Sequence, residues 1–198
     1  MRSKLVNTTG TDQVDIVAVK AFARITDEDE NALIERLIKN ARMTIERLAR
    51  ITIVEATRVA SFSMPTYRGT EVYDPDRVQR RINMPYDPIN SITSIVINGP
   101  ADDAVAVSSD LYKLDTVTGD IVFYDPLTPS SYKGTRLDVT YVAGYDNADA
   151  NPSTNPLPVD LYEAIVTLAV YWYDERDNAM SVPDTVMSVI KRYWSSIA

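Results

Sequence analysis

The sequence predicts an α+β protein, mainly a bundle of three to four helices with a small antiparallel sheet. Three observations indicate this class. A long stretch near the N-terminus repeats apolar residues at three- and four-residue steps, the middle of the chain carries short β-branched runs between turn residues, and an apolar helical run follows near the C-terminus. The chain contains no internal repeat and no low-complexity tract.

Composition limits the functions that this chain can have. Its 198 residues suffice for one domain with long arms, and 28 acidic against 20 basic residues give a formal charge of -8, which argues against a non-specific DNA binder. The absence of cysteine and histidine excludes disulfides, thiolate or imidazole metal ligands, and catalysis that needs either residue. The densest apolar run, Ala164 to Tyr173, is too short for a membrane span.

The N-terminal quarter contains the strongest helical pattern. Residues 1–14 are polar and unpatterned, so we expect an arm that is disordered unless something holds it. Residues 15–25 predict a short helix, and Thr26 to Arg50 predict a long amphipathic one. Its apolar stripe consists of Leu33, Ile34, Leu37, Ile38, Ala41, Ile45 and Leu48.

The start of the long helix carries its own signals. Thr26 is the expected cap, Asp29 stands in the capping-box position, and the acidic residues from Asp27 to Glu30 lie at the positive end of the helix dipole. Glu46 and Arg50 have the spacing of a surface ion pair. The acidic run is therefore interpreted as a solvated helix start.

From residue 51 the pattern becomes β-branched and alternating, which predicts strands. Two of them form a hairpin in which Gly119 supplies the permissive backbone dihedral. We expect one small antiparallel sheet. Its strands are predicted at residues 51–63, 91–98, 111–115, 120–124 and 136–143.

The densest basic spot lies at residues 64–90, a stretch with four prolines that is either a loop or a strand pair interrupted by turns. It consists of Arg77, Arg80 and Arg81. One interpretation is a solvated loop; the other is a contact with an acidic partner or with a DNA backbone.

Two further helices are predicted after a turn-rich linker at residues 144–158. The first, Val159 to Arg176, is apolar on nearly every face and should be buried between neighbours. The second begins at Pro183 and Asp184. We divide the chain into an arm (1–14), a helix and sheet domain (15–178), and a C-terminal helix with its tail (179–198). The stripe of the last helix consists of Val186, Ile190, Tyr193 and Ile197.

No catalytic residue, cofactor or metal site is predicted. Asp149 to Asp160 partly match a calcium loop, but Thr154 stands where glycine is required. Acidic pairs such as Asp74 with Asp76 suit a carboxylate-dependent hydrolase, yet charged turns and helix ends explain them better.

The order of several segments resembles a known family. VKAFARITDEDENALIERLIKNARMTIE is followed by NMPYDPINSITSI, YKLDTVTGDIVFYD, RLDVTYVAGY and LPVDLYEAIVTLAVYWYDERD. This series, over about residues 16–178, resembles the head-tail connector (adaptor) family of tailed bacteriophages and gene transfer agents. The insertion at residues 66–81 and the proline-rich linker depart from the shorter members.

The resemblance implies a structural protein of the virion neck, made in the host cytoplasm, with no enzymatic chemistry. It implies a homo-oligomeric ring, twelvefold in the virion, that joins the portal to a stopper or tail-side protein. DNA would pass through the channel without specific binding, and no membrane is involved. The alternatives are another virion ring protein, such as a stopper or tail terminator, and the hydrolase. The residues expected to contact the portal are Val186, Ile190, Tyr193, Trp194 and Ile197.

Overall fold

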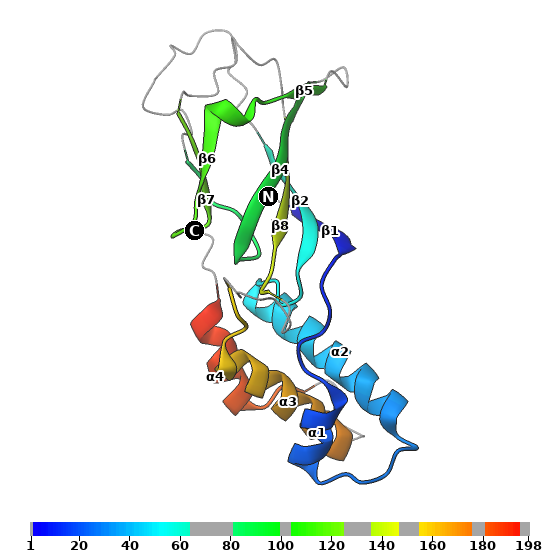
Figure 1. The fold of residues 1–198 in the computed structure, drawn as a ribbon. Helices are drawn as coiled ribbons and strands as arrows, with labels where there is room; N and C mark the ends of the chain where they lie inside the picture. The colour runs from blue at the N-terminus through cyan, green and yellow to red at the C-terminus, as the bar shows by residue number, and fades with distance from the viewer. Residues whose placement is uncertain are drawn as a thin grey trace. The chain divides into compact units, whose positions relative to one another are not determined.

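The computed structural model describes residues 2–63, 81–99, 104–124, 136–146, 155–175 and 181–194. The chain divides into two compact units, one of strands and one of helices (Figure 1). The strand unit comes from Met1–Thr8 and Ala56–Ala143, and the helical unit from Thr9–Glu55 and Gly144–Ser196. The predicted α+β class is confirmed.

The helical unit contains α1 (Ile16–Ala23), α2 (Asn31–Ala49), α3 (Val159–Asp174) and α4 (Asp184–Tyr193). Helix α3 contacts each of the other three. Its apolar side chains point in several directions, and eight of its residues are buried, as the sequence predicted for a helix between neighbours. The core of this unit therefore forms around α3.

Helix α2 buries a single stripe against α3, because its apolar residues recur with the helical period. Leu48 is 37% exposed, while the neighbouring Ala49 is fully buried. Leu48 therefore does not belong to the buried part of the predicted stripe. The residues of α2 that are buried are Ile34, Ile38, Ala41, Ile45 and Ala49.

The predicted start of the long helix is wrong. The helix begins at Asn31, and its N-cap residue Glu30 makes no side-chain capping bond. The side chain of Asp27 instead accepts a hydrogen bond from the backbone N–H of Asp29 at 2.9 Å, which closes a local turn. The predicted ion pair is also different, because Glu46 pairs with Arg42, and Arg50 ends the helix with φ 56°.

The strand unit contains a five-stranded sheet in the order β1-β2-β8-β4-β5 and a three-stranded sheet in the order β3-β7-β6. The predicted antiparallel strands are thus divided between two sheets. Every described strand pair is antiparallel. The strands are β1 (Arg2–Thr8), β2 (Ala56–Ser63), β3 (Arg81–Ile82), β4 (Ile89–Asn98), β5 (Ala104–Ala106), β6 (Tyr112–Asp115), β7 (Asp120–Phe123) and β8 (Arg136–Ala143).

The two sheets bury side chains in one shared cluster. Alternate residues of β8 point into it, because successive side chains of a strand point to opposite faces. Tyr141 is fully buried, and its hydroxyl donates to the carbonyl oxygen of Pro85 at 2.7 Å. Strands β6 and β7 form the predicted hairpin, in which Gly119 has φ 71°.

The expected N-terminal arm is instead an edge strand. Strand β1 pairs with β2, with Ser3 opposite Ala60 and Lys4 opposite Val59. Its exposed residues include Leu5 and Val6, so the side chains show little of the alternation by which a strand is predicted. Backbone pairing with β2 holds this segment.

Candidate interaction surfaces

The predicted portal-contact residues on α4 fall into two groups. Val186 and Ile190 are each 2% exposed and belong to the core of the helical unit. Their side chains are therefore unavailable to a partner, and this part of the prediction is corrected. Trp194, at the end of α4, is 59% exposed. Ile197 lies outside the described residues.

Tyr193 is held within the helical unit by the first turn of α3. Its hydroxyl donates a hydrogen bond to Asp160 Oδ1 at 2.5 Å, and the guanidinium of Arg192 lies 3.5 Å from the other oxygen of Asp160. Desolvation by burial, together with this carboxylate, raises the pKa of Tyr193 to about 12. Tyr193 thus ties α4 to α3, and Trp194 alone extends from this end as an exposed aromatic.

The described part of the predicted basic spot is already paired. The guanidinium of Arg81 lies 2.9 Å from Asp115 and 3.2 Å from Asp120, both on the β6–β7 hairpin. Backbone hydrogen bonding from Val117 is the main cause that holds the pKa of Asp115 below its usual value. Arg77 and Arg80 lie outside the described residues. A contact of these arginines with DNA or an acidic partner stays a prediction.

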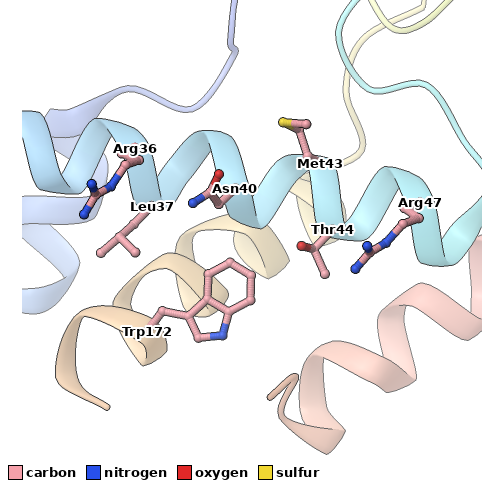
Figure 2. A pocket seen from close by; sticks show the side chains of 7 residues that line it. All are labelled: Arg36, Leu37, Asn40, Met43, Thr44, Arg47 and Trp172. Carbon is pink, nitrogen blue, oxygen red and sulfur yellow. The ribbon is translucent and has the colours of Figure 1, made fainter. Parts of the chain in front are cut away.

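An open groove runs along α2 (Figure 2). Its volume is about 620 Å³, and the indole of Trp172 from α3 lies beneath α2 at its floor. The indole N–H donates to the carbonyl oxygen of Ser181 at 2.8 Å, which fixes the ring. We call this site the α2 groove. Its described lining consists of Arg36, Leu37, Asn40, Met43, Thr44, Arg47 and Trp172.

The α2 groove combines apolar and basic side chains. Met43 is 51% exposed, and Arg36 and Arg47 are exposed near the two ends. No acidic residue occurs among the lining residues that the structure describes. The groove therefore suits a partner with apolar and acidic groups.

A second exposed apolar surface lies on α1, and we call it the α1 patch. It consists of Val17, Ala21 and Phe22, which are exposed on the half of the helix away from the buried Val19. Val17 and Ala21 lie one turn apart, and Phe22 is about 140° around the helix from Val17. Val17 is 68% exposed and Phe22 is 56% exposed. A hollow of about 510 Å³ adjoins Val17 and Ala21 and reaches Glu28 in the connection to α2. Lys20 and Arg24 also line this hollow. The patch is thus apolar, with basic residues at its edge and an acidic turn after it.

The described residues give no sign of metal chemistry or of a membrane span. Across these residues no group of three or more acidic side chains has a metal-binding arrangement. Within the same ranges, every helix is too short or too polar to cross a bilayer.

A family model described as head completion protein matches residues 14–193. The chain belongs to the head completion protein family. This membership confirms the resemblance drawn from the sequence to proteins of the head-tail junction. It is a family of virion structural proteins and not of enzymes, so the hydrolase alternative loses its support. No curated protein matches the chain.

Solved structures of gene transfer agent particles contain chains with the same fold. The chain is 20% identical, with a TM-score of 0.72, to one in "Neck of empty GTA particle computed with C6 symmetry". It is 21% identical to chains in "Neck of native GTA particle computed with C12 symmetry" and "Virion of native gene transfer agent (GTA) particle", with TM-scores of 0.67 and 0.70. Each match covers 100% of this chain and 97% of the other.

The sequence did not reveal the α2 groove. Leu37 belongs to the apolar stripe and was assigned to the core, whereas the structure leaves it partly buried at the edge of the groove. Met43 was the available signal, because it is a large apolar residue off that stripe, between Arg36 and Arg47. An isolated exposed apolar residue is common on protein surfaces, so this signal is weak without the structure.

Proposed function

We propose that this head completion protein is a neck adaptor, a subunit of a closed ring that joins the portal of the particle to a stopper or tail-side protein. The observation that carries the proposal is the whole-chain likeness to neck chains with a TM-score of 0.72. The C6 and C12 symmetry of the assemblies that contain those chains favours a ring of twelve copies. Family membership supports the same place in the particle.

The charge of the chain suits a channel through which DNA slides. Each copy carries a formal charge of -8, so a ring of copies repels the phosphate backbone rather than gripping it. The ring therefore extends the channel without specific DNA binding.

We further propose that the end of α4 contacts the portal through Trp194. This side chain is 59% exposed, and large aromatic residues are enriched at the energetic centres of interfaces. Val186, Ile190 and Tyr193 hold α4 on the helical unit, so they support the contact without making it.

The test is the mass of the purified chain in solution, alone and mixed with the portal of the same particle. The adaptor function predicts a defined complex with many copies of the chain once the portal is present. A chain that ignores the portal and assembles on a tail tube would identify a tail terminator instead. Assembly only on a preformed portal–adaptor complex would identify a stopper.

A further inference from the structure

The helical unit carries two exposed surfaces that differ in shape and charge. The α2 groove is concave, with apolar residues between Arg36 and Arg47. The α1 patch is a helix side with Val17 and Phe22 exposed beside a second hollow, and the acidic turn at residues 27–29 follows it. The described lining of the α2 groove shares no residue with the hollow beside the α1 patch. The two surfaces are therefore separate and can be occupied at the same time.

A closed ring of identical subunits needs two different surfaces that complement each other. Each subunit uses one surface toward the copy before it and the other toward the copy after it. Resting on the ring function above, we propose that the α1 patch and acidic turn of one copy dock in the α2 groove of the next copy.

The apolar parts of the two surfaces match in kind and size. Val17 and Phe22 are 68% and 56% exposed in the single chain, and burying them removes apolar surface from water. A cavity of about 150 Å³ is enough for a benzene-sized group. The α2 groove measures about 620 Å³, so it has room for several side chains from the neighbouring α1 patch.

The charges match as well. Arg36 and Arg47 form no ion pair within the described residues, and both line the groove. Asp27, Glu28 and Asp29 are exposed in the turn before α2. A neighbouring copy thus supplies carboxylates where the groove presents guanidinium groups, and opposite charges set the register of docking.

Another copy of the chain fits the groove better than DNA does. Phosphate contacts need basic or hydrogen-bonding groups, whereas the lining of the groove also includes the apolar side chains of Met43, Leu37 and Trp172. The chain is acidic overall, with 28 acidic and 20 basic residues, so complementary surface is abundant on a second copy. DNA remains an outcome that the experiment separates.

Single cysteines test the contact directly, because the natural chain has none. Phe22→Cys and Met43→Cys are made in separate chains, mixed under conditions in which the wild type forms rings, and treated with a short bismaleimide. A cross-linked dimer containing one chain of each kind is the expected product. Val159→Cys, at a 75% exposed position outside both surfaces, replaces Phe22→Cys as the control. A yield no higher than that control overturns the proposal.

Complementation provides a second measurement. A groove variant (Arg36→Glu with Arg47→Glu) and a patch variant (Val17→Asp with Phe22→Asp) should each lose ring formation at least tenfold while keeping the circular dichroism of the wild type. Their mixture should give a one-to-one dimer, because one intact contact survives. Lys39→Glu makes the same charge change as either groove substitution alone, on α2 but outside the described lining, and should still form rings.

The outcomes separate this proposal from the ring function itself. If the groove variant still forms rings, the proposed docking is wrong and the adaptor function is unaffected. If the groove variant forms intact rings but the particles no longer retain DNA, the groove binds DNA and not a second copy. A wild-type chain that forms no ring even with the portal would overturn both.

Discussion

The carboxylate of Glu46 on α2 accepts a hydrogen bond from the backbone N–H of Ile53 at 2.8 Å. The same oxygen lies 3.3 Å from the backbone nitrogen of Val54, and the other oxygen pairs with Arg42 at 2.9 Å. Ile53 and Val54 are buried, and both follow the end of α2. One side chain thus fixes the path of the chain just after the end of α2.

Glu46→Ala should destabilise the protein by about 2 to 3 kcal/mol, because two buried backbone N–H groups lose their charged acceptor. Chemical denaturation monitored by circular dichroism measures the change. Glu35→Ala removes an exposed carboxylate from the same helix and should cost less than about 0.5 kcal/mol. Equal effects of the two substitutions would contradict the role of Glu46.

Gly144→Ala should cost about 2 to 4 kcal/mol. Gly144 has φ 128°, and an added Cβ would lie 2.6 Å from the backbone Cα of Glu55, which has no room to move. Gly119→Ala is the comparison, because its added Cβ would first meet the mobile end of the Asp87 side chain, at 2.6 Å from Oδ1. Thermal unfolding should rank Gly144→Ala well below Gly119→Ala in stability.

Arg50→Gly should raise the free energy of unfolding by about 0.5 to 1 kcal/mol. Arg50 ends α2 with φ 56°, a left-handed conformation that costs roughly 1 to 2 kcal/mol for residues with a Cβ, and glycine adopts it freely. Arg47→Gly, one turn earlier inside the helix, should instead lower stability by about 1 kcal/mol. If Arg50→Gly is less stable than the wild type, the arginine side chain stabilises the protein by more than the left-handed backbone conformation destabilises it.

Alkaline pH should destabilise the strand unit through Tyr141. Burial raises the pKa of Tyr141 to about 12 from the usual 10.0. Because the pKa in the folded state is the higher one, the stabilising contribution is complete below pH 10 and is lost as the pH rises to 12, by about 2 to 3 kcal/mol. Urea unfolding between pH 9 and pH 12 should show this slope, and Tyr141→Phe should flatten it.

Trp194→Ala should leave the unfolding free energy nearly unchanged and weaken binding to the portal at least tenfold. Tyr193→Ala should lower stability, since it removes the hydrogen bond to Asp160 that joins α4 to α3. Pull-down by the portal, with unfolding curves for both variants, separates the two effects. Unchanged portal binding by Trp194→Ala would refute the proposed contact.

Elements with strong local patterns were predictable, and those that depend on distant partners were not. Strand β8 was predicted with its observed bounds, because its buried residues alternate from Leu137 to Ala143. The start of α2 was wrong because the side chain of Asp27 bonds within its own turn, so the acidic run lies outside the helix. Strand β1 was missed because its order comes from pairing with β2 rather than from its own side chains.

The candidate surfaces were less predictable than the fold. The sequence located the apolar stripe of α4, but an amphipathic stripe does not reveal whether the core or a partner covers it. The structure assigns Val186 and Ile190 to the core and leaves Trp194 exposed. The α2 groove depends on Trp172 of α3 lying beside α2, a proximity across more than a hundred residues that local patterns do not encode.

Most of the strand unit, Ala56–Ala143, is inserted in sequence between the two parts of the helical unit. A chain leaving the ribosome therefore completes its strands at Ala143 before α3 exists. Until α3 is made, Ile34, Ile38 and Ile45 of α2 lack the helix that buries them. A product truncated after the strands exposes this stripe to chaperones and proteases. A chain that ends before α3 therefore lacks the helix that covers this stripe.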